Sequence, residues 1–539
     1  MTYPGIGAWP ATRRIRTPDK TALIFGDRSY TYREFADAAD RVAAVLAIKG
    51  LGKGDAVAYL GENSPAFLFT LFGAAQIGVV FVPVNTRLAP PEVAHVLTDS
   101  GARAVICDPE LYEKVVPGVE AAGIAHVILT GEGTDADPGL NRLMTVPKGG
   151  HLDVPVAPQD PAIIMYTSGT TGKAKGAVLT HANLTWVSLN CVLDYDLVSS
   201  EVALLISPLF HAAAMGMGAL PIVLKGGTMV LEKGFDPGRA LALIQQHRIT
   251  MLSGVPTTYQ LMADHPDWDG TDLSSLRRLT CGGSAVPTRI LDEYEARGLK
   301  FTQGYGMTET SPGHTALSAD RTRDKQGSVG LPHFFSSVRI TDEKGDVVPR
   351  GTVGEIEVRG PNVFPGYLNL PEENAKAFTD DGWFRTGDMG YLDADGFLFI
   401  ADRLKDMIIS GGENIYPAEV ENHLFDIEGV TGAAVIGVPD EKWGEVPWAV
   451  LTVQHGAELT TERVQDHLNG RIARYKIPKN VVIVDELPRT ASGKVRKADL
   501  RARFGAGAEN PRPTGTAIPW QTETIRTAAS ADGRRWPKG

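Results

Sequence analysis

Short apolar runs typical of buried strands alternate with helical segments from the N-terminus to about residue 302. Thr31 and Glu34 form a capping box, and apolar residues then recur on one helical face until Gly50. Because parallel strands need helical crossovers between them, this alternation predicts a parallel sheet that is covered on both faces. The expected strands are 57–60, 79–82, 104–107, 204–206, 251–253 and 300–302, and the expected helices are 65–75, 90–98, 237–247 and one from Pro287.

The pattern changes beyond Gly327. Short alternating segments at 338–340, 354–358 and 390–401 indicate antiparallel pairing, and Asp395-Gly396 marks a hairpin turn. We expect a barrel-like antiparallel subdomain in this region. A smaller α+β unit is expected from Asp406, with helices from Pro417 and at 461–468 and strands at 432–438 and 448–453.

Size and charge exclude several classes of protein. At 539 residues the chain is too long for one core, and a length of this order indicates about two to four domains. The net charge of −11 argues against broad binding to nucleic acid or anionic membranes, which needs a basic surface. Gly73, Gln76 and Pro83 interrupt the apolar run at 66–84, so a buried helix and strand are favoured there over a membrane span.

Cysteine use and the chain ends bear on compartment. The three cysteines, which have no metal or disulfide spacing, fit a reducing cytoplasm, and the N-terminus shows no secretion signal. Residues 505–539 are rich in Gly, Ala, Pro and Thr with little apolar periodicity, so we expect a mostly disordered tail.

The segment 166–176 reads Tyr-Thr-Ser-Gly-Thr-Thr-Gly-Lys-Ala-Lys-Gly and follows the apolar run 162–165. A buried strand that leads into such a loop presents backbone N–H groups, hydroxyls and ammonium groups to one point, which predicts a phosphate-binding loop. The spacing differs from a Walker A motif, and a second apolar stretch follows at 177–179 instead of a helix. A flexible surface hairpin with solvated lysines is the alternative.

Further motifs follow the loop in a fixed order. They are Ser-Pro-Leu-Phe-His at 207–211, Gln-Gly-Tyr-Gly-Met-Thr-Glu at 303–309, Trp-Phe-Arg-Thr-Gly-Asp at 383–388, Asp-Arg-Leu-Lys-Asp at 402–406 with Ser-Gly-Gly-Glu-Asn at 410–414, and Leu-Pro-Arg-Thr-Ala-Ser-Gly-Lys at 487–494. Over residues 15–505 the chain thereby resembles the adenylate-forming superfamily, and within it most resembles bacterial fatty-acid or aryl-acid CoA ligases.

The resemblance implies an α/β fold in two domains. The large N-terminal domain, residues 1–404, would hold two αβαβα sheet subdomains, the β-barrel-like subdomain, and the ATP and acyl sites. Residues 405–504 would form a small mobile α+β lid domain, and 505–539 the tail.

The implied first reaction joins two anions, a carboxylate and the α-phosphate of ATP, so it needs concentrated positive charge and in-line positioning. By resemblance, Lys494 is the mobile catalytic lysine, Thr308 and Glu309 meet the α-phosphate and Mg2+, Tyr305 stacks on adenine, and Asp388 binds the ribose hydroxyls. Ala174 stands where the family often has proline. The implied ATP-binding residues are Thr167, Ser168, Gly169, Thr170, Thr171, Lys175, Gly283, Ser284, Gln303, Gly304, Tyr305, Thr308, Asp388, Arg403 and Lys494.

The second implied reaction is attack of the CoA thiol on the same carbonyl. By resemblance, the small domain swings about a hinge at Lys405 and presents Ser410, Gly411 and Gly412 to the pantetheine arm, where glycines allow close backbone approach.

The resemblance also implies an acyl pocket with His211 as a gate beside the carboxylate. Its expected lining carries no obvious cation or carboxylate, which favours an uncharged fatty or aromatic tail. The implied catalytic residues are Lys494, Thr308, Glu309 and His211, and the implied pocket residues are His211, Ala212, Met215, Val255, Cys281, Gly282, Gly306 and Pro312.

Alternatives keep the adenylating machinery and change the acceptor: loading of a carrier protein, or adenylation of nitrite to diazotise an arylamine. No carrier domain is fused to the chain, which favours a free thiol. A nucleotide-binding protein without chemistry is disfavoured, because Lys175, Glu309, Asp388, Arg403 and Lys494 are all present. We therefore expect a carboxylic acid, ATP, Mg2+ and CoA as reactants, with no nucleic-acid partner and no transmembrane segment. The resemblance also allows a homodimer.

Overall fold

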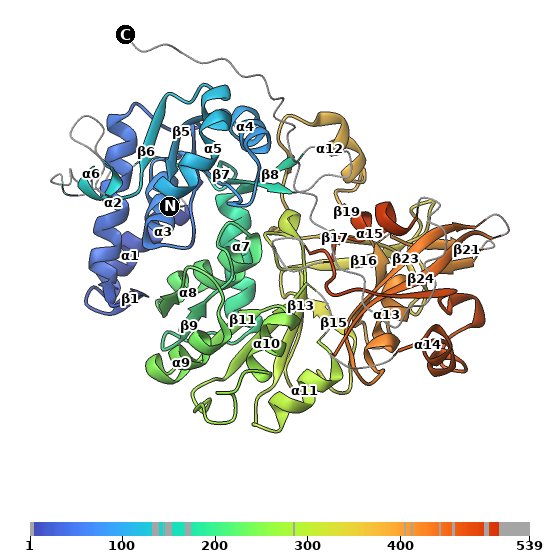
Figure 1. Ribbon diagram of the computed structural model, residues 1–539. Coiled ribbons are helices and arrows are strands. Elements are labelled where there is room, and N and C mark those ends of the chain that lie inside the picture. The colour runs from blue at the N-terminus through green and yellow to red at the C-terminus, as the bar shows by residue number, and fades with distance from the viewer. Residues whose placement is uncertain are drawn as a thin grey trace, which may run out of the picture. The chain divides into compact units, whose positions relative to one another are not determined.

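A computed structural model describes residues 5–131, 139–143, 145, 154–167, 174–283, 286–403, 406–410, 413–440, 443–454, 459–489 and 495–505. The described residues up to Arg403 form one compact unit, and those from Asp406 onwards form a second. Both mix helices and strands, as the α/β prediction requires (Figure 1). Among the described residues, no helix has the length and apolar character needed to cross a bilayer.

The first sheet of the large unit is parallel from β7 to β6, whereas β8 pairs antiparallel with β7 and with the edge strand β18. Its spatial order is β18 (Gly366–Tyr367), β8 (Lys175–Thr180), β7 (Pro161–Thr167), β4 (Val80–Pro83), β3 (Ala56–Leu60), β5 (Ala102–Cys107) and β6 (His126–Leu129).

The second sheet joins the remaining parallel strands to the antiparallel ones. Its order is β16 (Ser337–Thr341), β17 (Gly354–Arg359), β19 (Phe384–Leu392), β20 (Leu398–Arg403), β15 (Ser328–Pro332), β14 (Thr315–Leu317), β13 (Phe301–Tyr305), β12 (Arg278–Gly282), β11 (Met251–Gly254), β9 (Val202–Leu205), β10 (Thr228–Leu231), β1 (Thr21–Phe25) and β2 (Arg28–Thr31). The antiparallel strands expected beyond Gly327 therefore continue one sheet through β14 and β15.

Helices cover these sheets. In the large unit they are η1 (Ile6–Ala8), α1 (Trp9–Arg16), α2 (Tyr32–Ile48), α3 (Pro65–Gln76), α4 (Pro90–Asp99), α5 (Pro109–Ala121), α6 (Leu140–Leu143), α7 (His181–Asp194), the π-helix η2 (Ala214–Ala219), α8 (Leu220–Lys225), α9 (Pro237–His247), α10 (Pro256–Ala263), α11 (Thr288–Glu295), η3 (Thr308–Thr310) and α12 (Pro371–Ala377). Thr31 caps α2 in the predicted box with Glu34.

Burial on both faces confirms the prediction of a covered sheet. Along β3, Val57 and Tyr59 point into one hydrophobic cluster, whereas Ala58 and Leu60 point into another. This alternation is the two-residue period of a strand that is covered on each side.

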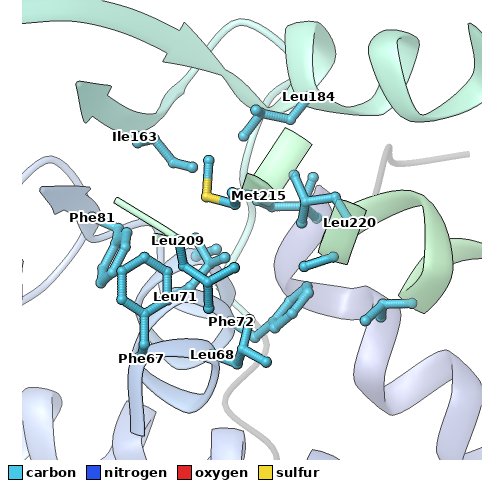
Figure 2. Packing of buried hydrophobic residues seen from close by; sticks show 14 of the residues in the cluster. Phe67, Leu68, Leu71, Phe72, Phe81, Ile163, Leu184, Leu209, Met215 and Leu220 are labelled. Carbon is cyan, nitrogen blue, oxygen red and sulfur yellow. The ribbon is translucent and has the colours of Figure 1, made fainter. Parts of the chain in front are cut away.

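The larger cluster lies between the two sheets and holds η2 in place. Phe67 of α3 and Phe81 of β4 meet edge to face with ring centroids 5.1 Å apart. Met215 of η2 lies between Leu184 of α7 and Leu209 in the same cluster (Figure 2). Because such close-packed cores resist deformation, the chain around 211–219 has a defined position.

The second unit is a small α+β structure. Its sheet order is β22 (Glu413–Ile415), β21 (Ile408–Ser410), β24 (Gly444–Val453) and β23 (Val430–Asp440), with β25 (Asn480–Ile483) pairing to β24. Its helices are α13 (Pro417–Phe425), α14 (Thr461–Leu468), η4 (Arg474–Lys476) and α15 (Lys497–Phe504). The expected helix at 461–468 is confirmed. The tail predicted beyond Gly505 lies outside the described residues.

Candidate active site

The glycine-rich segment lies at the tip of the β7–β8 hairpin, and α4 holds both ends of it. Tyr166 donates a hydrogen bond to Asp99 Oδ2 over 2.7 Å, and His95 Nε2 lies 2.9 Å from the carbonyl oxygen of Ala174. Thr167 ends β7 and Lys175 begins β8. The predicted phosphate ligands Ser168, Gly169, Thr170 and Thr171 lie outside the described residues.

Lys175 and Glu309 approach the same tyrosine. The Lys175 ammonium lies 5.4 Å from the ring centroid of Tyr367, whose hydroxyl donates to Glu309 Oε1 over 2.8 Å. Glu309 is buried. Burial first, and then the Glu309 charge, raise the pKa of Tyr367, so its hydroxyl stays a donor at neutral pH. Tyr367 therefore joins the end of the hairpin to η3.

Lys175 also forms an ion pair with Glu373 of α12, at 2.6 Å. Lys175 is the more buried partner, because 15% of its side chain is exposed against 35% for the side chain of Glu373. The hydrogen bond from Lys175 lowers the pKa of Glu373. Lys376 contacts the other carboxylate oxygen at 3.5 Å, so Glu373 has a second cation beside it.

Tyr305 and Asp388 are joined directly. The Tyr305 hydroxyl, at the end of β13, donates to Asp388 Oδ2 over 2.6 Å. Asp388 is buried, and its backbone pairs with Arg403 across β19 and β20. The side chain of Arg403 lies outside what the structure describes. Tyr305 and Glu309 both lie on the short segment that runs from β13 to η3. This segment therefore carries one residue of the Tyr305–Asp388 contact and one of the Tyr367–Glu309 contact.

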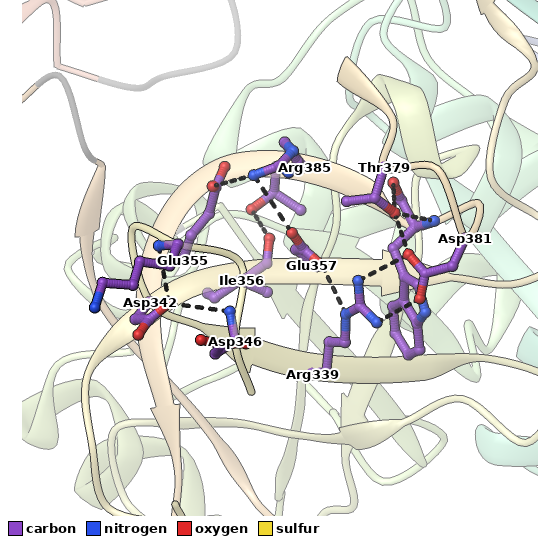
Figure 3. Close-up of polar contacts among 12 residues, drawn as sticks. Arg339, Asp342, Asp346, Glu355, Ile356, Glu357, Thr379, Asp381 and Arg385 are labelled. Carbon is purple, nitrogen blue, oxygen red and sulfur yellow. Dashed lines mark hydrogen bonds and ion pairs between the residues drawn. The ribbon is translucent and has the colours of Figure 1, made fainter. Parts of the chain in front are cut away.

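Ion pairs brace the strand that carries Asp388 (Figure 3). Glu357 of β17 pairs with Arg339 at 2.6 Å and lies 3.6 Å from Arg385, three residues before Asp388. Arg339 also contacts Asp381 at 2.7 Å. Glu357 is fully buried, and removing one partner of a buried pair leaves an uncompensated charge. This network therefore fixes the position of β19.

Strand register brings the remaining predicted nucleotide residues together. Gln303 and Gly304 of β13 lie opposite Cys281 and Gly282 of β12. Gln303 Oε1 accepts a hydrogen bond from the backbone of Val286, so it holds the segment after β12. Gly283 has φ +87°, a conformation that favours glycine. Ser284 lies outside the described residues.

Two of the predicted acyl residues, Gly306 and Pro312, lie in close contact. A Cβ on Gly306 would lie 1.5 Å from the carbonyl oxygen of Pro312, and one on Gly216 would lie 2.6 Å from Pro312 Cδ. The backbones therefore touch where glycine leaves room. Val255 follows Gly254, which pairs with Cys281 in the sheet.

The π-helix region presents a different set of side chains from the predicted one. Met215 and Ala212 are buried and Met215 points into the core, whereas Ala213 is exposed and His211 and Met217 are half-buried. Met217, which the sequence analysis did not name, is partly exposed within the π-helix. The ring of His211 lies against Phe210, with centroids 4.7 Å apart.

The predicted CoA residues belong to the second unit. Ser410 ends β21, is buried, and pairs with Gly444 of β24. Gly411, Gly412, the hinge residue Lys405 and the catalytic candidate Lys494 lie outside the described residues. The site geometry is therefore that of the large unit.

Glu309 fits a magnesium ion that is held mainly by substrate. Among the residues that the structure describes, no group of three or more His, Cys, Asp or Glu side chains is arranged to hold a metal. Mg2+ commonly binds through one or two carboxylates together with substrate phosphates. A buried carboxylate near the phosphate-loop lysine suits that arrangement.

Two sheets with a glycine-rich segment between β7 and β8, a Tyr–Asp pair and a buried glutamate are typical of an adenylate-forming enzyme, and the comparisons agree. The profile of the AMP-binding enzyme family matches residues 12–368, and that of its C-terminal domain matches 419–494. The chain belongs to this family, and it is an AMP-forming acid–thiol ligase of the acyl-CoA synthetase class. Enzymes of this class use ATP, Mg2+ and CoA.

Individual relatives span almost the whole chain. A feruloyl-CoA synthase from an Amycolatopsis species is 48% identical over 94% of this chain and 100% of its own length. An indoleacetate–CoA ligase from Aromatoleum aromaticum is 41% identical over 90% and 95%. Among solved structures, ATP-bound MatB from Rhodopseudomonas palustris has a TM-score of 0.87 and 33% identity over 94% of this chain and 99% of its own.

Proposed function

We propose that this chain joins an aromatic carboxylic acid to CoA through an acyl-adenylate. The observation that carries the proposal is that Lys175, Glu309, Tyr305 and Asp388 converge through Tyr367 and the β13–η3 segment. These are the residues that the family resemblance assigns to the phosphates, Mg2+, adenine and ribose. Their contacts form two groups within the large unit, Lys175–Tyr367–Glu309 and Tyr305–Asp388, which the chain joins through residues 305–309.

In the first step, a carboxylate oxygen attacks the α-phosphorus of ATP and pyrophosphate leaves. Lys175 and the backbone of its loop hold the β- and γ-phosphates, while Thr308 and Lys494 meet charge on the α-phosphate. Asp388 accepts from the ribose hydroxyls, and Tyr305 stacks on the adenine. Glu309 would hold Mg2+, which would neutralise charge on the phosphates when bound.

In the second step, the CoA sulfur attacks the acyl carbonyl, AMP leaves, and the thiol proton passes to solvent. Lys494 must withdraw before the thiol can reach the same carbon. The small unit would therefore rotate about Lys405 and bring Ser410, Gly411 and Gly412 to the pantetheine arm.

The acid is proposed to be aromatic for two reasons. The named relatives with the highest identity given above act on ferulate and indoleacetate. The accessible residues at the π-helix, Ala213 and Met217, are small or flexible and uncharged, which suits a neutral ring.

A substrate panel tests the proposal. Pyrophosphate release and thioester formation are measured with cinnamates, benzoates, arylacetates and fatty acids, with and without CoA. Aromatic acids should give CoA-dependent thioesters with the highest kcat/KM. A preference for long-chain acids would overturn the aromatic assignment, and turnover that needs nitrite and an arylamine but no CoA would overturn the thioester step.

The division of labour between the two steps is tested with Lys494→Ala. This variant should lose adenylation by orders of magnitude, while thioester formation from supplied acyl-adenylate stays near the wild-type rate. Equal loss in both steps would contradict the assigned role of Lys494.

A further inference from the structure

A buried histidine–aspartate pair lies at the end of β15. The imidazole of His333 has no exposed surface, and its Nδ1 lies 2.5 Å from Oδ2 of Asp194, the last residue of α7. A carboxylate only accepts hydrogen bonds, so Nδ1 carries the proton and donates it to Asp194. In the neutral ring, Nε2 is then an acceptor.

That acceptor has no hydrogen-bond partner among the described residues. His314, whose backbone carbonyl accepts from the His333 amide, offers a contrast. Its Nε2 lies 3.0 Å from the Ser337 carbonyl and its Nδ1 lies 3.3 Å from Asn362 Nδ2, so both nitrogens are paired. Buried polar atoms are rarely left unpaired, because each one costs stability. The Nε2 of His333 therefore indicates a missing partner.

The position of Nε2 suggests which molecule supplies the partner. A Cβ on Gly313 would lie 3.1 Å from His333 Nε2 and 3.5 Å from the sulfur of Met217. Gly313 follows Pro312, which the family resemblance assigns to the acyl pocket. Gly313 places no side chain against the buried Nε2, and the unbranched Met217 can change rotamer at low cost.

We infer that His333, oriented by Asp194, is a specificity-determining residue that accepts a hydrogen bond from a hydroxyl group on the ring of the aromatic acid. The inference rests on the proposed function. A phenolic hydroxyl is neutral and carries a proton to donate, whereas an alkyl tail or a methoxy group carries none. A hydroxyl would enter where Met217 moves aside and would satisfy the buried nitrogen.

The test compares acids that differ in one substituent. Wild type is assayed with cinnamate and with its 2-, 3- and 4-hydroxy and methoxy derivatives. At least one hydroxy isomer should exceed both cinnamate and its methoxy analogue in kcat/KM by about tenfold, the scale of one hydrogen bond to a buried partner. No preference for any hydroxy isomer over cinnamate would overturn the inference.

Variants assign the preference to this histidine. His333→Leu should lower kcat/KM for the preferred hydroxy acid by about tenfold, and change the value for cinnamate little. Asp194→Asn should reduce the ratio of kcat/KM for the hydroxy acid to kcat/KM for cinnamate while keeping the imidazole. A carboxylate only accepts, whereas the asparagine amide can also donate to Nδ1, so the ring tautomer is no longer fixed. His314→Asn, at the paired neighbour, should lower both substrates equally. If His333→Leu keeps the wild-type ratio of kcat/KM for the hydroxy acid to kcat/KM for cinnamate, the assignment is refuted.

Gly313→Ala keeps the assignment testable if His333→Leu does not fold. The added methyl would lie against Nε2 and should abolish the preference in kcat/KM for the hydroxy acid over cinnamate. If no acid yields a thioester, the proposed function fails by itself. Calorimetric binding of the hydroxy acids to wild type and to Gly313→Ala then decides about His333. Equal affinity of the two proteins would overturn its role.

Discussion

The hydroxyl of Tyr367 donates a hydrogen bond to the buried carboxylate of Glu309 over 2.8 Å. The pairing orients a carboxylate that is proposed to hold Mg2+, and the same ring faces the Lys175 ammonium. A single side chain thus contacts both the lysine that we propose binds the nucleotide phosphates and the carboxylate that we propose holds Mg2+. A mutation of Tyr367 can distinguish the contribution of its hydroxyl from that of its ring.

Tyr367→Phe keeps the ring and removes the hydroxyl. We expect the Mg2+ concentration for half-maximal pyrophosphate release to rise by about tenfold, because Glu309 loses a hydrogen bond that orients it. Tyr294→Phe is the matched control, since its buried hydroxyl donates to the Tyr259 carbonyl away from this network. Tyr294→Phe should lose stability and keep the wild-type Mg2+ dependence. The same Mg2+ response in Tyr367→Phe and wild type would refute the positioning role.

Glu373 pairs with the ammonium of Lys175, which we propose also binds the nucleotide phosphates, so the two anions would compete for one cation. Glu373→Gln removes the carboxylate that pairs with Lys175 at 2.6 Å, so the KM for ATP should fall by about threefold, within the range of a partly exposed ion pair. Glu372→Gln changes the same charge one residue away and should leave KM unchanged. The difference should shrink at high salt. A raised KM in Glu373→Gln would show that Glu373 instead holds Lys175 in its binding position.

Gly306 tests the close backbone contact beside the site. A methyl group at this position would lie 1.5 Å from the Pro312 carbonyl oxygen, so the backbone must move. We expect Gly306→Ala to lower the free energy of unfolding by about 3 kcal/mol in urea titration. Gly282→Ala is the control, because its added Cβ would meet nothing nearer than 3.8 Å. Equal stability of the two variants would contradict the contact.

His314 makes stability depend on pH. Burial lowers its pKa to about 4 from the ordinary 6.5. Between these values the unfolded chain binds a proton that the folded chain does not, so stability is lost as pH falls through this window. The loss from this group amounts to about 3 kcal/mol at most. Urea midpoints at about pH 7.5 and about pH 4.5 should differ less in His314→Asn than in wild type. An equal pH dependence in both proteins would contradict the assignment.

Local signals predicted many elements well. The capping box at Thr31 and the helices at 237–247 and 461–468 depend on residues within a few positions of one another, and the structure has them at those bounds. The motif residues Tyr305, Glu309 and Asp388 were likewise identified from the motifs that hold them. By contrast, no local pattern separates Met215, which lies in the core, from Met217, because a π turn changes which side chains face outward.

The sequence by itself determined the alternation of strands and helices, the two apolar runs that flank the glycine-rich segment, and the family, because each depends on neighbours in the chain. Only the tertiary structure decided that Tyr367 contacts Glu309 from 58 residues away and that His333 contacts Asp194 from 139 residues away. These pairs arise from sheet order and from which helices pack beside which strands. Sheet order and helix packing depend on burial across the whole unit, so the spacing of residues along the chain does not predict these pairs.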